Sequence, residues 1–169
     1  MNNNKFIFTI NVDKVLKDNN ILLNGDSRNV LQKANRPYYV SVPLTIKHSA
    51  FIPLRTRLPH RFGFVTKRSE DSISGLDYTK SLIVERSSFS SYLVKESGIS
   101  LKEAQVIKNN EYTIQNLYQK FVFETFIPAL EKAEKARTPK EVRLVTFSSL
   151  QYFEPVLLQM KTEPRAYVQ

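Results

Sequence analysis

The sequence has no cysteine, only two histidines and only four glycines among its 169 residues. A chain without cysteine forms no disulfides, has no thiolate metal ligands and has no cysteine nucleophile. Two histidines without cysteine do not favour a zinc site. Four glycines without a GxxxxGK[ST] or GxGxxG pattern give no support to a nucleotide-triphosphate loop.

Carboxylate groupings of the kind that bind hard metals such as Mg²⁺ are also lacking. The acidic residues outside the strand patterns lie at helical spacing, where a solvated helix face is the more ordinary interpretation: Glu103, Glu111, Glu131 and Glu134. We therefore expect no metal and no cofactor.

Long apolar runs and a signal peptide are missing as well. The first residues, MNNNK, have neither the apolar core nor the small-residue cleavage site of a signal peptide. Residues 121–127 form one of the longest apolar runs, but the run is far too short to span a bilayer and it contains Glu124. We expect a cytoplasmic protein that has no membrane partner.

Acidic residues are absent from residues 27–69, a segment called here the basic block. It contains nine lysines and arginines: Arg28, Lys33, Arg36, Lys47, Arg55, Arg57, Arg61, Lys67 and Arg68. The chain has 25 Lys and Arg against 16 Asp and Glu, so the remainder holds 16 of each and the net charge of +9 lies in the block. Such a segment favours a polyanionic partner, because neutralising phosphates releases counterions.

Strand patterns fill the first half of the chain. Alternating or β-branched runs predict strands at residues 5–12, 38–46, 50–54, 62–66 and 81–85. Pro43 lies inside the second of these, which favours an edge position or a bulge. The segments between them are expected to be a short helix or turn at 13–23, a break at 24–26, weak helix at 27–33, a hairpin turn at 47–49 and a loop at 67–77.

Helical spacing begins after about residue 87. Ser100 and Glu103 have the spacing of a capping box, and residues 113–136 form an amphipathic pattern that Pro128 should kink or divide. Thr138 and Pro139 are typical of a helix start, and we expect this last helix to continue to a break at residues 154–155. The two halves predict one α+β domain over residues 1–169, with a strongly twisted antiparallel sheet covered by helices.

The residues around the end of the third strand pattern have the chemistry to act on RNA. RNA supplies its own nucleophile, the 2′-hydroxyl, so cleavage needs a group to take its proton, cations for the charge that builds on phosphorus, and an acid for the departing 5′ oxygen. Arginine matches phosphate oxygens with a planar fork, a threonine hydroxyl can bond a phosphate or relay a proton, and histidine has the pKa range for acid or base work. The candidate catalytic residues are Arg36, Arg55, Thr56, Arg57 and His60.

The other cations of the basic block are candidate RNA-binding residues: Arg28, Lys33, Lys47, Arg61, Lys67 and Arg68. Tyr38 is added to them, because aromatic side chains interleaved with basic ones stack on bases. Strand alternation lets only one of Tyr38 and Tyr39 face that side, and the other belongs to the core. His48 falls in the predicted hairpin turn and is not expected to be catalytic.

The order of these residues resembles a known family. Three segments are similar to successive sequence motifs of the type III toxin–antitoxin endoribonucleases, which include the ToxN, TenpN and AbiQ-like toxins. They are Arg36-Pro37-Tyr38, Phe51-Ile52-Pro53-Leu54 and Arg55-Thr56-Arg57. The segments 75–78 and 146–153 also look similar to later parts of that family. The resemblance is greatest to its TenpN branch, and its specific part runs from Arg36 to about His60.

The resemblance implies a compact, highly twisted antiparallel β-sheet surrounded by α-helices, related to the Kid/MazF type of toxin. It implies metal-independent cleavage of RNA, including mRNA, to a 2′,3′-cyclic phosphate in a phage-defence system. The implied partner is a small RNA antitoxin, a pseudoknot cut from a tandem-repeat precursor, which would form a closed assembly with the protein.

Individual residues also follow from the resemblance. Arg36 stands where the family has a basic active-site residue, and Thr56 stands at its Ser/Thr catalytic position. The family's lysine after that position is replaced by Leu58 at the expected spacing, so Arg57, His60 or Arg61 must substitute for it.

Two other functions stay open on the residues alone. One is a non-catalytic RNA-binding module that uses the same basic face, and cleavage without a metal draws on the same residues as such binding. The other is an assembly or phage-defence scaffold whose basic block is only solvated, which the one-sided charge distribution disfavours.

Overall fold

The computed structural model describes residues 6–23 and 27–167. Within these residues the chain forms a seven-stranded antiparallel sheet in the order β4–β5–β3–β2–β1–β7, and β6 also pairs with β3. The strands are β1 (Ile7–Ile10), β2 (Tyr38–Pro43), β3 (His48–Arg55), β4 (Gly63–Arg68), β5 (Ile73–Asp77), β6 (Leu82–Glu85) and β7 (Leu93–Glu96). The predicted α+β class with an antiparallel sheet is confirmed.

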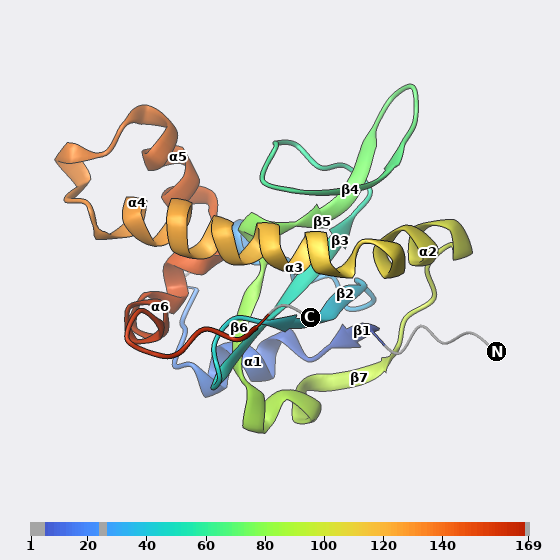
Figure 1. Cartoon of the computed structure of the whole chain (residues 1–169), viewed down its shortest axis with the longest axis horizontal. Helices are drawn as coiled ribbons and strands as arrows, with labels where there is room; N and C mark the ends of the chain where they lie inside the picture. The colour runs from blue at the N-terminus through green and yellow to red at the C-terminus, as the bar shows by residue number, and fades with distance from the viewer. Residues whose placement is uncertain (1–5, 24–26, 168–169) are drawn as a thin grey trace.

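Strand β3 is the centre of the sheet. One of its edges pairs with β2, whereas the other pairs first with β6, from His48 to Phe51, and then with β5, at Leu54 and Arg55. Because this second edge has two successive partners, the sheet divides along β3, and Figure 1 shows the β4–β5 hairpin leaving from that side. Arg55, the last residue of β3, lies at this division.

The helices come mainly from the second half of the chain. They are α1 (Val12–Asp18), α2 (Leu101–Asn109), α3 (Glu111–Lys120), α4 (Ile127–Glu131), α5 (Pro139–Phe147) and α6 (Glu154–Met160). In Figure 1, α2, α3 and α4 follow one another across the sheet, and α5 and α6 lie at the α4 end. No helix of the described chain is long and apolar enough to cross a membrane.

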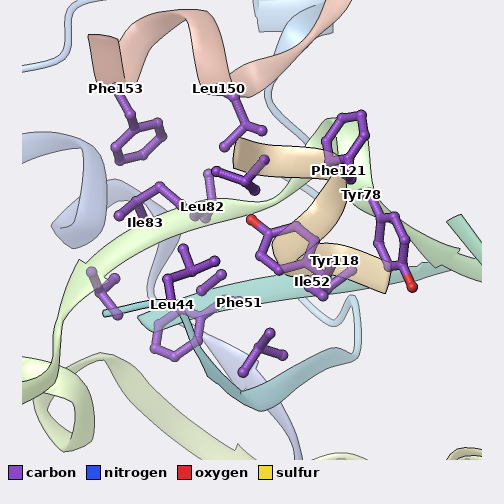
Figure 2. Packing of buried hydrophobic residues seen from close by; sticks show 14 of the residues in the cluster. Leu44, Phe51, Ile52, Tyr78, Leu82, Ile83, Tyr118, Phe121, Leu150 and Phe153 are labelled. Carbon is purple, nitrogen blue, oxygen red and sulfur yellow. The ribbon is translucent and has the colours of Figure 1, made fainter. Parts of the chain in front are cut away.

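The core lies between the sheet and these helices. Figure 2 shows Phe51 and Ile52 of β3 beneath the ring of Tyr118 from α3. All three side chains are fully buried. Tyr118 and Ser81 are joined by a 2.7 Å hydrogen bond between their hydroxyl oxygens, so the polar end of the ring is also satisfied inside the core.

The predicted helix-capping signals act where they were expected. The Ser100 hydroxyl accepts a hydrogen bond from the Glu103 N–H at the start of α2, and Thr138 forms a capping box with Glu141 at the start of α5. Pro128 does not divide the long helix, which continues from Glu111 through a π-helical turn to Glu131, short of the predicted end at residue 136. That turn, Phe121–Phe126, accommodates the proline, which lacks an N–H and cannot continue the α-helical ladder.

Several predicted boundaries were wrong. The expected change to helices after about residue 87 comes later, because Leu93–Glu96 form β7. Residues 67–77 form the end of β4, a turn and β5 rather than a loop, because backbone pairing in a projecting hairpin does not need apolar side chains on both faces. The helix that starts at Pro139 ends at Phe147 rather than near residue 154, since Ser148 caps a separate 3-10 turn. Pro155 then lies in the first turn of α6, where a proline is well tolerated.

Smaller differences concern the first half of the chain. The weak helix at 27–33 is reduced to the 3-10 turn Ser27–Asn29, and the predicted break at 24–26 lies outside the described residues. His48 begins β3 instead of lying in the turn, and the hairpin closes through bonds from the Leu44 and Thr45 N–H groups to the His48 carbonyl.

Candidate functional site

An ion pair joins the end of β3 to the end of β5. Arg55 donates a hydrogen bond from Nη1 to Oδ2 of Asp77 over 2.7 Å. In the β3–β5 ladder Arg55 is paired with Gly75, so Asp77, two residues further along β5, lies diagonally opposite on the same face of the sheet. A long side chain can bridge such a diagonal pair. The register of the sheet therefore brings the two charges together.

Asp77 is a completely buried carboxylate, and both of its oxygens accept hydrogen bonds. Its side chain is 0% exposed, and Oδ1 accepts hydrogen bonds from the Thr79 N–H (3.0 Å) and the Thr79 hydroxyl (2.7 Å). Burial raises the pKa of Asp77, but the hydrogen bonds from His60, Arg55 and Thr79 lower it more, so that its pKa lies below the ordinary value. Asp77 is therefore a fixed negative charge around which the neighbouring cations are arranged.

His60 is held in one tautomer. It lies in the loop between β3 and β4, where its Nδ1 accepts a hydrogen bond from the Phe62 N–H over 3.1 Å. The proton of the neutral ring is therefore on Nε2, which lies 3.2 Å from Oδ1 of Asp77 and 3.1 Å from the Thr79 hydroxyl. Both ring nitrogens are occupied, so His60 in this state orients Asp77 instead of offering a free nitrogen.

Arg36 lies beside the same pair. Its Nη1 donates to the carbonyl oxygen of Leu54 over 3.3 Å, while its buried Nε has no hydrogen-bond partner within the described residues. Burial lowers the pKa of Arg36, and the nearby charge of Arg55 lowers it further, whereas Tyr38 and Asp77 act in the opposite direction. The guanidinium stays charged. Of these two arginines, only Arg55 is paired with the carboxylate, so the charge of Arg36 is left for an incoming anion.

A cavity of about 670 Å³ opens next to His60. It lies between the β3–β4 loop and helix α5, and His60 and Thr79 belong both to its wall and to the hydrogen-bonded group around Asp77. The whole lining consists of Pro59, His60, Arg61, Phe62, Thr79, Lys140, Arg143, Leu144 and Phe147. Its volume falls within the ~300–1,000 Å³ range of small-molecule sites.

The five predicted catalytic residues separate into two groups. Arg55 and His60 contact Asp77, and Arg36 lies next to Arg55, where it binds the Leu54 carbonyl. Thr56 and Arg57 follow the end of β3 with exposed side chains, and neither side chain forms a hydrogen bond or ion pair with another described residue. The structure therefore brings three of the five residues together near Asp77 and leaves Thr56 and Arg57 exposed after the end of β3.

The predicted RNA-binding cations are all exposed, but they do not all lie near the group around Asp77. Arg61 lines the cavity, and Lys67 and Arg68 end β4 on the projecting hairpin. Lys47 precedes the first residue of β3, whereas Arg55 is its last; eight strand residues separate their positions by roughly 25 Å. Lys47 is thus removed from the group around Asp77, because the hairpin turn and the strand end lie at opposite ends of β3. Arg28 and Lys33 lie on the segment before β2, which also carries Arg36.

The prediction that Tyr38 stacks on bases was wrong. Tyr38 is 1% exposed and Tyr39 is 0% exposed, so neither ring offers a face to a ligand. The Tyr38 hydroxyl donates to the carbonyl oxygen of Leu31, and the Tyr39 hydroxyl accepts from Gln115. Both faces of β2 are covered, which strand alternation alone does not reveal.

The sequence did not reveal two parts of the site, the buried Asp77 with Thr79 and the cavity wall formed by helix α5. Asp77 and Thr79 lie outside the basic block, and the only local signal was a single acid within the apolar run that ends β5. Lys140 and Arg143 are far away in the sequence, and nothing in the spacing of α5 connects them with His60. Among the described residues, no three His, Asp or Glu side chains lie close enough together to hold a metal ion.

Comparisons with protein-family models, with curated proteins and with solved structures found no match. The functional conclusion therefore rests on the residues of this chain and their geometry.

Proposed function

We propose that this protein is a cytoplasmic endoribonuclease toxin of the type III toxin–antitoxin class, which cleaves RNA without a metal ion and is inhibited by a small structured RNA. The observation that carries the proposal is the contact of Arg55 and His60 with the buried Asp77, with Arg36 bound to the neighbouring Leu54 carbonyl, beside a cavity lined by further cations. Two guanidinium groups near a single carboxylate retain charge for a phosphate. The resemblance of residues 36–60 to that family supports the same reaction.

The reaction proceeds by attack of the RNA 2′-oxygen on the adjacent phosphorus. The bond from phosphorus to the 5′ oxygen breaks, and the products carry a 2′,3′-cyclic phosphate and a 5′-hydroxyl group. Arg55, held by Asp77, and Arg36, held by the Leu54 carbonyl, stabilise the negative charge that develops on the phosphoryl oxygens. Fixed donors of this kind need little reorganisation during the reaction.

Proton transfer places a separate demand on the site. His60 reaches the cavity wall, but its two nitrogens are engaged by Phe62 and by Asp77 with Thr79. To serve as an acid or base it must release one of these contacts when RNA binds. Arg36 and Arg55 therefore supply electrostatic stabilisation of the transition state. His60 contributes to proton transfer only when one of its contacts with Phe62, Thr79 or Asp77 is broken.

The occupied nitrogens of His60 favour a second candidate, RNA binding without cleavage. The same arginines and the same cavity would then hold a phosphate that never reacts. The two candidates differ in what happens to bound RNA, and one assay separates them.

The assay is incubation of the purified protein with single-stranded RNA in excess EDTA. Cleavage to products with 2′,3′-cyclic phosphate ends is expected, together with survival of an all-2′-deoxy strand of the same sequence. Arg86→Ala is a control for the loss of one exposed cation away from the site. RNA that is bound but stays intact would favour the binding module, and activity that appears only with Mg²⁺ or Mn²⁺ would refute the metal-independent mechanism.

The RNA partner is tested separately. A small structured RNA can occupy the substrate site with its own backbone, and a closed protein–RNA assembly is expected. Such a complex should weaken steeply with salt, because each neutralised phosphate adds to the slope of log affinity against log salt concentration. The gene is expressed together with its upstream locus, and the protein is purified at low salt. The purified protein should carry nucleic acid, seen as a raised ratio of absorbance at 260 nm to that at 280 nm. Material without nucleic acid, and with no salt-dependent RNA binding, would argue against an RNA antitoxin.

A further inference from the structure

One face of helix α5 is turned toward the β3–β4 loop. Lys140, Arg143, Leu144 and Phe147 have the spacing i, i+3, i+4 and i+7, so they form a single stripe along the helix, and all four line the cavity next to His60. Arg61 and Phe62 form part of the opposite wall. Two segments far apart in the sequence thus present the same pair of residue types, cationic and aromatic, to one space.

The aromatic part of the cavity is unusually accessible. Phe147 is 60% exposed although it ends a helix that packs on the core, and Phe62 is half-buried. An exposed phenylalanine inside a cavity offers a ring face to a flat ligand. The His60 ring lies beside that of Phe62, with centroids 5.9 Å apart, so the loop wall also presents aromatic surface.

The cations of the cavity lack counter-charges. Within residues 6–23 and 27–167, neither Arg61 nor Lys140 nor Arg143 forms an ion pair with a carboxylate. Glu141, the acid nearest to them on α5, is already engaged by Lys132 and by the Thr138 cap. Three uncompensated positive charges around an apolar floor suit a ligand that is flat and apolar at one end and anionic at the other.

The position of Phe147 is fixed from behind. The buried Lys80 donates from Nζ to the carbonyl oxygens of Phe147 and of Asn29, which ties the end of α5 to the segment before β2. The Ser148 hydroxyl donates to the Thr79 carbonyl, next to the group that holds Asp77. The stripe on α5 is thus pre-organised relative to His60 and Thr79, and binding costs little ordering.

We infer that this cavity binds one unpaired nucleotide of a single-stranded RNA, with the base against Phe147 and the neighbouring phosphates against Lys140 and Arg143, while Arg61 lies over the Phe62 ring on the opposite wall. Because His60 and Thr79 are shared with the group around Asp77, the bound nucleotide lies next to the phosphate held by Arg36 and Arg55. If the proposed cleavage function holds, this nucleotide flanks the broken bond, and the cavity sets the sequence preference there. Helix α5, from the neutral part of the chain, is then a determinant of substrate choice.

The binding test uses a fluorescent single-stranded oligoribonucleotide with 2′-O-methyl groups, which cannot be cleaved through its 2′ oxygen. Phe147→Ala should weaken its affinity by about 5- to 150-fold, the range of an aromatic–base stack. Arg143→Ala should reduce the log–log salt slope by about 0.7, the share of one phosphate on a single strand, while Phe147→Ala leaves that slope unchanged. Tyr112→Ala is the matched aromatic control, since Tyr112 is 59% exposed and lies outside the cavity, and Arg86→Ala is the charge control.

Cleavage is measured in parallel by sequencing the ends of products from a random RNA pool. A changed base preference at one position in Phe147→Ala, with the Tyr112→Ala pattern unchanged, supports the inference. If the wild type cleaves RNA but the variants keep both its affinity and its base preference, the cavity assignment fails and the proposed function stands. If Phe147→Ala weakens binding but the wild type does not cleave, the cavity assignment stands as an RNA-binding site and the cleavage function fails. Equal displacement of the oligonucleotide by polyglutamate would overturn the assignment, because the cavity would then recognise charge alone.

Discussion

Gly75 pairs with Arg55 across the β3–β5 ladder and has the backbone of β4 pressed against its other side. A Cβ atom at Gly75 would lie 2.3 Å from the carbonyl oxygen of Phe64. Real Cβ atoms do not come so close to backbone oxygen, so a side chain here requires β4 or β5 to move. Since Asp77 is two residues further along β5, the missing side chain of Gly75 helps to keep the Arg55–Asp77 pair in register.

Gly75→Ala should therefore damage both stability and function. We expect the free energy of unfolding to fall by roughly 1–3 kcal/mol, the usual cost of overpacking. RNA cleavage should also fall, because Asp77 no longer holds Arg55 in place. Urea unfolding and the EDTA cleavage assay measure the two effects. Gly98→Ala is the matched control, because a Cβ at Gly98 meets nothing within 4 Å. Wild-type stability in Gly75→Ala would show that β4 yields without cost.

Asp77→Asn should uncouple the cations of the site. An asparagine keeps the size of the side chain but lacks the negative charge that pairs with Arg55 and accepts a hydrogen bond from His60. Removing one partner of a buried ion pair costs on the order of 3 kcal/mol, which urea unfolding at neutral pH can detect. Asp71→Asn is the control, since Asp71 is exposed in the β4–β5 turn and forms no ion pair with a described residue. Equal effects of the two substitutions would contradict the central place given to Asp77.

Sequence patterns predicted the antiparallel sheet well because its core strands are short apolar, β-branched or aromatic runs bounded by turn signals. The run that became β3 and the run that became β6 are dense in apolar side chains, and burial on both faces leaves such runs few alternatives. The strand predicted at residues 62–66 is β4, but β5 escaped prediction because most residues of 67–77 are polar, and β5 is fixed by backbone pairing with β4 and β3. Local composition does not record that pairing.

The candidate site was found from one side only. Charge segregation drew attention to Arg36, Arg55 and His60, which do come together. Asp77 was not recognised, because its role depends on a diagonal contact across the β3–β5 ladder, and register is not visible from one strand. Lys140 and Arg143 were missed for a similar reason, since α5 meets the β3–β4 loop only in three dimensions.

Arg55→Lys should separate geometry from charge. Lysine keeps the positive charge but lacks the planar fork that can contact Asp77 and a phosphate together. Cleavage should fall on the order of 100-fold, as for the loss of one oxyanion-hole donor, while binding of an uncleavable RNA changes little. Arg86→Lys, which makes the same chemical change at an exposed position away from the site, should leave both measurements unchanged. Full activity of Arg55→Lys would mean that a point charge is sufficient at this position.

A second buried carboxylate, distant from the cavity, should control the acid stability of the chain end. Glu163 accepts hydrogen bonds from the Thr45 hydroxyl over 2.6 Å and from Nδ1 of His48 over 2.9 Å. Next to it, the N–H of Ile46 donates to the Pro164 carbonyl, so this contact fastens the C-terminal segment to the β2–β3 turn. Burial raises the pKa of Glu163, but the bonds from Thr45 and His48 and the charge of Lys47 lower it more, to below the ordinary 4.5.

A carboxyl group whose pKa is depressed in the folded state contributes stability that is fully present above its unfolded pKa and is lost as the pH falls through the folded value. For Glu163 the loss begins as the pH falls below 4.5. Urea unfolding of the wild type from about pH 6 to about pH 3 should show this loss of stability, together with the loss that comes from Asp77.

Glu163→Gln should be less stable than the wild type at about pH 6, by about 1–3 kcal/mol for a hydrogen-bonded charge, and should lose less stability on acidification. Glu70→Gln, which removes an exposed carboxylate of the β4–β5 turn without an ion pair among the described residues, should leave the wild-type profile unchanged. A Glu163→Gln profile parallel to that of the wild type would mean that the C-terminal segment is held by its backbone bonds and apolar contacts alone.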